Sequence, residues 1–275
     1  MINLLFCGSK NVFPGILTAV LSMLEFSEKD EVHVSVFTMD KTDLDPRFTP
    51  ISDAQIALLD RVLKESHPSS SARLVDVKEI YEKELGGCPN ESAYCTPYTL
   101  VRLLADLVEG MPDKFLYLDC DLMFHRDVHL LYDIDISNYE YGGAPDQYGK
   151  WLLLHRPFYL NAGVLLFNLA YCKKSGLFEK ARGLLRKKKY LFADQTAIIK
   201  STKRRKYLRQ RFNDQRRITK NTVIRHFAKR MLWLPYPHVV NIKQWDVDKV
   251  HSVYHYHQFD AVYARYESLK EELDL

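Results

Sequence analysis

Two carboxylates at a spacing of two residues, Asp119 and Asp121, directly follow the apolar run 115–118. This run comes after a turn-like Pro-Asp-Lys sequence and has the composition of a buried strand. Side chains alternate along an extended chain, so both Asp side chains can point the same way while Cys120 points the other way. Paired carboxylates at the carboxyl end of a buried strand can hold a hard divalent cation. The alternative is a loop in which the two Asp residues cap a helix or turn.

The elements that must position this pair alternate between strands and helices along the chain. Strands are expected at 2–7, 32–38, 74–77, 115–118, 139–143 and 162–167. Helices are expected at about 14–26, 52–65, 97–108, 173–188 and 263–273, the second opened by the capping-box sequence Ser52-Asp53-Ala54-Gln55. Short extended segments are expected at 209–213 and 222–227. This alternation predicts βαβ units and a mostly parallel α/β sheet.

Length and composition fit one domain over residues 1–275. Of the 275 residues, 47% are hydrophobic, and no linker separates a second domain. The five cysteines are odd in number and form no Cys-x-x-Cys pair, which favours a reducing compartment over a disulfide frame or a zinc site. The apolar segment 13–24 reads as an amphipathic helix rather than a signal peptide, and no apolar run reaches the ~18 residues of a spanning helix. We therefore predict a cytoplasmic protein.

Charge is distributed unevenly along the chain. Region 186–230 contains 17 Lys and Arg but only two acidic residues, a local charge of +15, whereas the remainder carries 22 basic and 33 acidic residues, or −11. Such asymmetry favours a polyanionic partner: a nucleotide diphosphate, an anionic membrane surface or a nucleic acid. A solvated basic face is the alternative interpretation.

Three segments together resemble family 8 glycosyltransferases, retaining enzymes that include bacterial lipopolysaccharide galactosyl- and glucosyltransferases and glycogenin. They are residues 115–121 (FLYLDCD), 161–169 (NAGVLLFNL) and the pair Asp194-Gln195. The resemblance runs in order from residue 1 to about 230, which leaves about 231–275 as a small C-terminal extension. It implies a GT-A fold, a Rossmann-like mixed, mostly parallel sheet flanked by helices. It also implies transfer of a hexose, galactose or glucose, from a UDP-sugar to an oligosaccharide or lipid-linked glycan, in lipopolysaccharide or capsule biosynthesis.

The resemblance further implies a divalent cation, usually Mn²⁺, with Mg²⁺ as the alternative. Asp119 and Asp121 match two of the family's ligands, and a distant His supplies the third. His226 follows an extended segment as the family's His does, while His255 and His257 are competitors. Mixed carboxylate and imidazole ligands favour Mn²⁺ over Mg²⁺.

Further positions match the family's donor site. Cys7, Ser9 and Asn11 fall in its nucleotide loop, although the family often has Asp where Ser9 stands. Either Lys229 or Lys243 is expected to serve the diphosphate, because Lys229 stands where the family has Gly and the later Lys243 suggests an inserted segment. The expected donor-binding residues are Cys7, Ser9, Asn11, Arg102, Asp119, Cys120, Asp121, Asn161, Ala162, Gly163, Lys229 and Lys243.

Asp146, Asp194 and Gln195 match positions near the donor sugar and the reacting centre. Gln195 falls on the face of the anomeric carbon where a retaining nucleophile would stand, yet an amide is a poor nucleophile. A front-side mechanism is therefore expected, with Asp194 and Asp146 as alternative nucleophiles. The segment 147–160, rich in Tyr, Trp and His, is expected to help form the acceptor site.

Other functions fit the residues less well. A haloacid-dehalogenase-like phosphatase carries its Asp-x-Asp in the first strand, whereas this pair lies more than 100 residues into the chain. A basic nucleic-acid-binding protein would interleave aromatic residues with its cations, but region 203–212 offers only Tyr207 and Phe212. A non-catalytic nucleotide-sugar binder is expected to have lost one Asp of the pair. Peripheral contact of region 186–230 with the anionic inner face of a membrane is preferred over nucleic acid.

Overall fold

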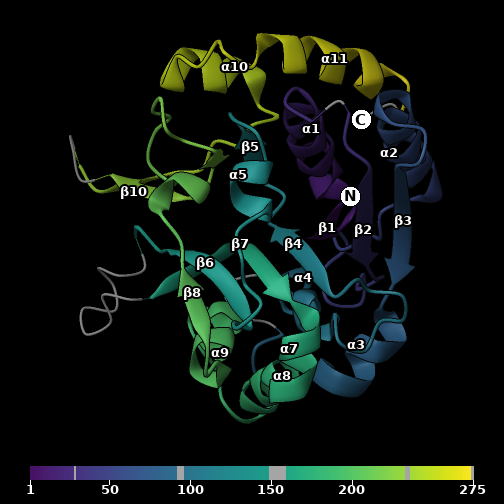
Figure 1. The fold of residues 1–275 in the computed structure, drawn as a ribbon, viewed down its shortest axis with the longest axis vertical. Helices are drawn as coiled ribbons and strands as arrows, with labels where there is room; N and C mark the ends of the chain where they lie inside the picture. The colour runs from purple at the N-terminus through teal and green to yellow at the C-terminus, as the bar shows by residue number, and fades with distance from the viewer. Residues whose placement is uncertain (28, 92–95, 149–158, 233–235, 274–275) are drawn as a thin grey trace.

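The computed structural model describes residues 1–27, 29–91, 96–148, 159–232 and 236–273. A seven-stranded sheet with the order β3-β2-β1-β4-β7-β6-β8 crosses the middle of the molecule (Figure 1). Its strands are β1 (Ile2–Cys7), β2 (Val32–Thr38), β3 (Ser71–Asp76), β4 (Lys114–Leu118), β6 (Tyr141–Pro145), β7 (Leu160–Asn168) and β8 (Arg205–Tyr207). β7 runs antiparallel to both β4 and β6, and the other neighbours are parallel. The expected mixed, mostly parallel α/β sheet is confirmed.

Helices cover both faces of this sheet (Figure 1). One layer contains α1 (Phe13–Leu24), α2 (Asp53–Ser66), α5 (His129–Tyr132), α10 (Val247–Lys249) and α11 (Asp260–Glu271). The other contains α3 (Lys78–Leu85), α4 (Tyr98–Val101), α7 (Leu169–Ser175), α8 (Leu177–Lys187) and α9 (Ala193–Ser201). No described helix has the length and apolar character needed to cross a lipid bilayer.

Strand β4 shows why the sheet is buried on both sides. Leu116 and Leu118 point into the core shared with α1, whereas Phe115 and Tyr117 point into the core shared with α4. A strand covered on both faces is apolar at every position, which is why this run carries no polar alternation. The continuous apolar run is therefore what places the following carboxylates at the edge of the sheet.

Shorter elements complete the site side of the molecule. β5 (Leu122–Phe124) pairs with β9 (Ile224–His226), and β10 (Arg230–Leu232) forms a hairpin with β11 (His238–Val240). The remaining turns of helix are η1 (Lys10–Val12), η2 (Arg102–Leu104) and η3 (Gln210–Phe212), all 3₁₀, and the π-helix η4 (Val250–Tyr254).

Several expected elements need correction. The helix expected over 173–188 is two helices, because Gly176 has φ 68 and ends α7. The helix expected over 97–108 is only α4 followed by the 3₁₀ turn η2, and the extended segment expected at 209–213 contains the 3₁₀ turn η3. The capping box at Ser52 is confirmed, since the Ser52 hydroxyl and the Gln55 side chain each accept the other residue's backbone N–H.

Candidate active site

Asp119, Asp121 and His226 converge where β4 ends, and we call them the donor-pocket cluster. One ligand atom from each lies within 4.8 Å of the other two. His226 Nε2 is 2.9 Å from Asp121 Oδ1 and 3.9 Å from Asp119 Oδ2. The backbone bends after Leu118 instead of staying extended, yet the carboxylates converge as expected and Cys120 Sγ turns away to the Cys7 carbonyl.

Strand pairing brings these distant residues together. β5 begins directly after Asp121, and its antiparallel pairing with β9 sets Leu122 opposite His226. On the other side, the Asp119 N–H donates to the Gly163 carbonyl of β7 at 2.8 Å. A Cβ on Gly163 would lie 2.4 Å from His226 Cε1 and 2.8 Å from Asp119 Oδ2. Only glycine leaves room for the cluster against β7.

The cluster has the donor set of a divalent cation site. Two carboxylates and one imidazole suit Mn²⁺ better than Mg²⁺, which prefers oxygen and water. Burial disfavours the ionised Asp121 carboxyl, but Lys243 and His226 outweigh it and hold the pKa of Asp121 well below its usual range. Lys243 Nζ lies 2.5 Å from Asp121 Oδ2. The residues present therefore fit the cation that the sequence resemblance implies.

A chain of hydrogen bonds orients the imidazole. His226 Nδ1 lies 2.9 Å from the buried Asn213 Oδ1, which can accept its hydrogen and so leave Nε2 as the ligand atom. Asn213 Nδ2 donates to Asn161 Oδ1 at 2.8 Å, and Asn161 Nδ2 donates to Asp146 Oδ2 at 3.2 Å. Gln195 Nε2 donates to the same carboxylate oxygen at 2.9 Å. The chain thus connects the predicted metal ligand with two of the predicted catalytic residues.

Gln195 is fixed at both ends of its carboxamide. While Nε2 donates to Asp146, Oε1 accepts the Ala162 N–H at 3.0 Å. These two hydrogen bonds fix which end of the amide is oxygen and which is nitrogen. The Ala162 N–H can only donate, and the Asp146 carboxylate accepts. A single rotamer therefore faces the cavity.

Arg102 ties the donor-pocket cluster to Asp194. Its guanidinium donates to Asp119 Oδ1 at 3.0 Å, and its Nε lies 3.4 Å from Asp194 Oδ2. The ring of Tyr117 stacks beneath it, with the guanidinium carbon 3.9 Å from the ring centroid. Burial raises the pKa of Asp194, and Arg102 opposes that rise. This buried ion pair sets the geometry of two predicted donor contacts at once.

A cavity of about 870 Å³ opens over these residues. Its wall includes most of the residues predicted from the sequence: Cys7, Ser9, Arg102, Asp119, Cys120, Asp121, Asp146, Asn161, Ala162, Gly163, Asp194, Gln195, His226, Lys229 and Lys243. The size falls in the range of small-molecule sites.

Three predicted features lie elsewhere. Asn11 is exposed, does not line the cavity, and donates its amide to the Arg47 carbonyl at 3.1 Å, because the chain turns into η1 at Lys10. His255 belongs to no described group of metal-ligand side chains. Of the expected acceptor segment 147–160, residues 149–158 lie outside the described residues.

The sequence reasoning gave no role to Asn213, Tyr117 or Gln244. Asn213 contacts the His226 ring, and the Tyr117 ring packs against the Arg102 guanidinium. Nothing in the local sequence distinguishes either residue from an ordinary core residue. Gln244 is fully buried, and its Nε2 lies within hydrogen-bond distance of the Gly15, Cys120 and Leu122 carbonyls. Gln244 directly follows Lys243, the residue that the sequence does predict at the site.

Between Lys229 and Lys243, where the sequence suggests an inserted segment, the chain forms the antiparallel strand pair β10–β11. Arg230 pairs with Val240, so the chain leaves and re-enters the site region at neighbouring points. Both Lys229, before the hairpin, and Lys243, after it, line the cavity. The two lysines, although separated by this strand pair in the sequence, thus both lie at the candidate site.

Similarity to known proteins is consistent with this geometry. A Haemophilus influenzae protein named as a glycosyltransferase is 26% identical over 192 residues, which is 66% of this chain and 58% of that relative. Glycosyltransferase GlyA of Streptococcus pneumoniae is 38% identical over 77 residues, 28% of this chain and 10% of the relative. The chain thus spans less than two thirds of the length of these relatives.

Solved structures share the fold. The galactosyltransferase LgtC, solved with donor and acceptor sugar analogs, superposes with a TM-score of 0.68 at 18% identity, over 96% of both chains. The bifunctional glycosyltransferase WbbM gives 0.67 at 17% identity over 96% of this chain and 51% of its own. The sequence profile described as Glycosyl transferase family 8 matches residues 3–231. The chain belongs to glycosyl transferase family 8.

Proposed function

We propose that this chain is a retaining glycosyltransferase that moves a hexose, galactose or glucose, from a UDP-sugar to a glycan acceptor. The observation that carries the proposal is the donor-pocket cluster on the wall of a cavity of about 870 Å³. A UDP-sugar needs a cation at its diphosphate and polar groups at its sugar, and both kinds of residue line this one cavity. The neighbour LgtC is a galactosyltransferase that was solved with donor and acceptor sugar analogs, which supports the same ligand classes here.

Asp119, Asp121 and His226 are the residues that would hold Mn²⁺, with Mg²⁺ as the alternative ion. The bound ion would supply Lewis-acid stabilisation of the charge on the departing diphosphate. Lys243 and Lys229 would add positive charge at the same end of the cavity. Cys7, Gly8 and Ser9 line the cavity at the carboxyl end of β1 and would contact the nucleotide there.

Gln195, Asp146 and Asn161 would define the sugar end. In the proposed reaction the bond from the anomeric carbon to the phosphate oxygen breaks, and a bond to the acceptor oxygen forms on the same face. The departing phosphate oxygen takes the acceptor's proton. The neutral carboxamide of Gln195 is held rigidly and would stabilise positive charge on the sugar through its dipole. Asp194 is paired with Arg102. Asp146 already accepts N–H groups from Tyr148, Asn161 and Gln195, so both carboxylates are weaker candidates for a covalent nucleophile.

The first experiment is UDP release by the purified chain with Mn²⁺ across UDP-, GDP- and CMP-sugars, without acceptor. Slow hydrolysis of one UDP-hexose that stops with chelator is expected, because water can replace the acceptor. A matched variant, Asp121→Ala, should release no UDP. If UDP does not bind in the presence of Mn²⁺, the proposal is wrong, and nucleic acid becomes the next ligand to test.

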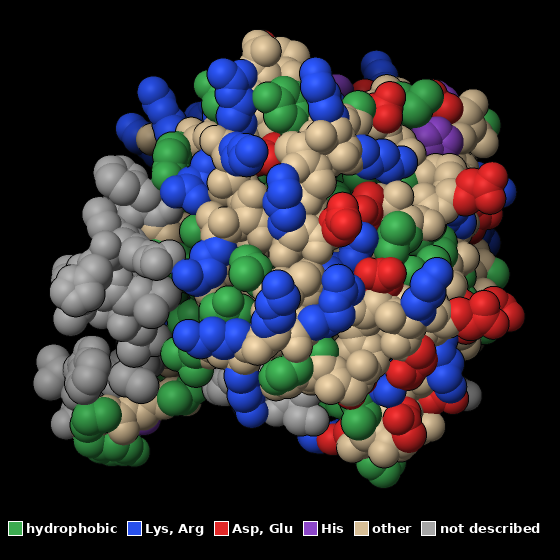
Figure 2. All heavy atoms as spheres, turned by 90° about the horizontal axis from the view of Figure 1, so that it is seen from below, with side chains coloured by type: hydrophobic (Ala, Val, Ile, Leu, Met, Phe, Trp, Pro, Cys, Tyr) green, Lys and Arg blue, Asp and Glu red, His purple; other side chains and the backbone are tan. Residues whose placement is uncertain are grey.

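We also propose that the basic region 186–230 places the enzyme against the anionic cytoplasmic face of a membrane, where a lipid-linked glycan would be presented. Figure 2 shows Lys and Arg side chains spread over the face seen from below in Figure 1, with acidic side chains gathered toward one side. The exposed Lys and Arg residues of this region include Lys187, Lys188, Lys189, Lys200, Lys203 and Arg204. Each basic residue near an anionic surface contributes about 1 kcal/mol to binding.

Vesicle sedimentation tests this placement. Replacing Lys187, Lys200, Lys203 and Arg204 with Gln should release the protein from vesicles that contain anionic lipid. The control replaces Lys64, Lys249, Arg265 and Lys270, four basic residues on the opposite helical layer, and should keep binding. Equal binding by both variants would remove the membrane proposal while leaving the glycosyltransferase proposal intact.

A further inference from the structure

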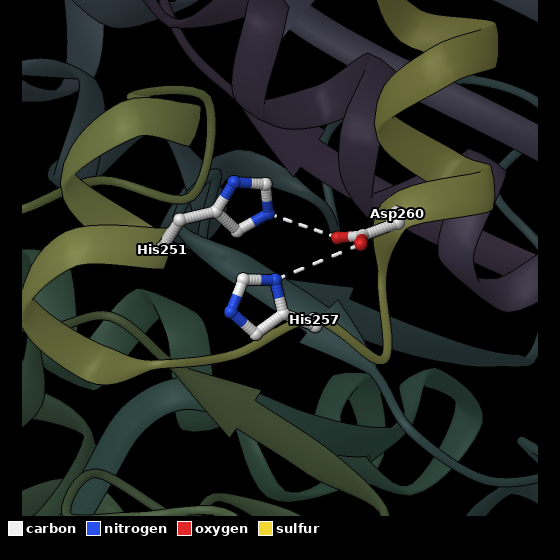
Figure 3. Close-up of side chains that lie close together, drawn as sticks. All are labelled: His251, His257 and Asp260. Carbon is white, nitrogen blue, oxygen red and sulfur yellow. Dashed lines mark hydrogen bonds and ion pairs between the residues drawn. The ribbon is translucent and has the colours of Figure 1, made fainter.

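His251, His257 and Asp260 form a second group of possible ligand side chains, which we call the C-terminal cluster. Figure 3 shows both imidazole rings presenting a nitrogen to the same carboxylate. His251 Nε2 is 2.9 Å from Asp260 Oδ1, and His257 Nδ1 is 3.7 Å from Asp260 Oδ2. One ligand atom from each residue lies within 4.8 Å of the others. None of the three lines the cavity of the candidate active site.

The local backbone is shaped to make this convergence. His251 lies on the π-helix η4, and Asp260 is the first residue of α11. Between them, His255 takes φ 55, the one described non-glycine residue in the left-handed region, and so ends η4 and turns the chain back. As a result His257 stacks on His251, with ring centroids 4.7 Å apart. A strained residue persists where the surrounding structure fixes it, and here it holds two imidazoles over one carboxylate.

We propose that the C-terminal cluster binds a divalent transition-metal ion of the zinc class. Two imidazole nitrogens and one carboxylate oxygen are borderline donors that suit Zn²⁺ and Co²⁺, whereas Mg²⁺ prefers oxygen alone. Tetrahedral zinc with bonds of about 2.0–2.2 Å needs donor atoms roughly 3.3 Å apart. The present separations of 2.9 and 3.7 Å bracket that value, and water would complete the coordination.

The side chains have the freedom to make the remaining adjustment. The side chains of His251, His257 and Asp260 are 31%, 64% and 55% exposed. No Lys or Arg of the described chain forms an ion pair with Asp260, so its charge is available to a cation. A bound ion would replace the 2.9 Å hydrogen bond between His251 and Asp260 and displace water from these exposed side chains.

Binding would fasten the C-terminal extension. The cluster links η4 to the first turn of α11, and Val262 and Tyr266 of α11 pack in the same core as α1. The segment that carries Lys243 and Gln244 into the candidate active site lies just before η4 in the chain. A metal at the C-terminal cluster would have a structural role, stabilising the junction of η4 and α11, and would take no part in sugar transfer.

The test measures Zn²⁺ stoichiometry by isothermal titration after removal of all metal. It uses the Asp121→Ala background, because the donor-pocket cluster would bind Zn²⁺ as well. One Zn²⁺ per chain is expected in this background, and none after His257→Ala is added. His67→Ala, which removes a histidine at the end of α2, is the matched control and should keep the full stoichiometry. Titration with Co²⁺ should show the visible absorption of a low-symmetry nitrogen and oxygen site only where His257 is present.

A second readout separates binding from folding. Zn²⁺ at about 100 times its dissociation constant should raise Tm by about 5 °C, and His257→Ala should abolish that rise. His257 is largely exposed, so its removal should leave the circular dichroism spectrum unchanged. Asp260→Asn keeps a hydrogen-bond acceptor for His251 and should weaken Zn²⁺ at least about tenfold. Unchanged stoichiometry in the His257→Ala variant, or no Zn²⁺ bound in the Asp121→Ala background, would overturn the proposal.

Discussion

Asp119 and Asp121 meet His226 from chain segments more than 100 residues apart, whereas the three residues of the C-terminal cluster lie within ten residues of one another. The donor-pocket cluster is largely buried, set by strand pairing, and supported by Asn213, Arg102 and the missing Cβ of Gly163. The C-terminal cluster is exposed and set by one local turn. Similar donor atoms are thus held rigidly in one place and loosely in the other. The comparison indicates that two clusters with similar donor atoms differ chiefly in the residues that support those atoms.

The largest expected effect separates the two clusters by function. Asp121→Ala should lower UDP-hexose transfer at least about 10³-fold, because it removes a cation ligand at the developing charge of the leaving group. Asp260→Ala should change transfer less than twofold. Steady-state rates with Mn²⁺ measure both. Activity above a tenth of wild type in Asp121→Ala would mean that the buried cluster is not the catalytic one.

Gly163→Ala tests the close packing of β7 against the donor-pocket cluster, a feature that the exposed C-terminal cluster lacks. The added methyl would meet His226 and Asp119 at less than 3 Å, so we expect transfer to fall about 10²-fold and the free energy of unfolding to fall by about 1–3 kcal/mol. Gly183→Ala in α8 is the control, since a Cβ there meets nothing within 4 Å and should stabilise by about 0.5–1 kcal/mol. Transfer rates and urea unfolding are measured for both variants. Equal rates and equal unfolding free energies in the two variants would contradict the steric argument.

Asn213→Ala tests whether a residue that supports a ligand, rather than a ligand itself, affects the donor-pocket cluster. Removing the acceptor of His226 Nδ1 should weaken Mn²⁺ binding about 10- to 100-fold while the ligands themselves remain. Asn221→Ala, at an exposed turn in the same region, should leave affinity unchanged. The Mn²⁺ concentration that gives half-maximal transfer is the measurement. Equal values for the two variants would show that Asn213 does not orient the imidazole.

The smallest expected effect is at Glu140, a buried carboxylate outside both clusters. It serves as a reference because hydrogen bonds from the protein, without a cation, stabilise its charge. Burial disfavours its charge, but hydrogen bonds from Ser175, Thr202 and the Arg204 and Lys203 N–H groups outweigh this and lower the pKa of Glu140 below 4.5. A lowered folded-state pKa contributes stability above the unfolded value, and that stability is lost as pH falls through the folded value.

Glu140→Gln should therefore cost about 1–2 kcal/mol of unfolding free energy at pH 7, and the difference should shrink as pH falls below 4.5. Urea unfolding between pH 7 and pH 3 follows the difference. A gap between wild type and variant that stays constant with pH would contradict the assignment of charge to Glu140.

Local signals predicted the elements well and the distances between them poorly. The hydroxyl of Ser52 caps α2 as its sequence indicates, and the apolar run before Asp119 is the buried strand β4. Gly176 was the visible signal for the break between α7 and α8. β9 lies within the extended segment expected at 222–227. However, β5 and β9 have only three residues each, too few to predict that they pair and bring His226 beside Asp121.

The same contrast applies to the site residues: the sequence indicates single residues, but not the contacts between them. His226 could be chosen from its order in the chain, but Asn213 carries no pattern that marks it as the partner of a ring 13 residues later. The family resemblance predicts Asn11 in the nucleotide loop, but the 3₁₀ turn that begins at Lys10 directs its side chain to the Arg47 carbonyl. Lys243 was recognised by type, whereas its contact with Asp121 depends on the hairpin that precedes it.

The buried Gln244 has a consequence for how the protein is made. Its single amide group reaches the carbonyls of Gly15, Cys120 and Leu122, which belong to the beginning and the middle of the chain. During synthesis on the ribosome these carbonyls emerge long before residue 244 does. The loop that carries Asp119 and Asp121 thus lacks the Gln244 amide, one of its hydrogen-bond partners, until residue 244 has left the ribosome. The nascent chain can therefore complete the wall of the candidate active site, which includes Lys243 and Trp245, only after this segment has emerged.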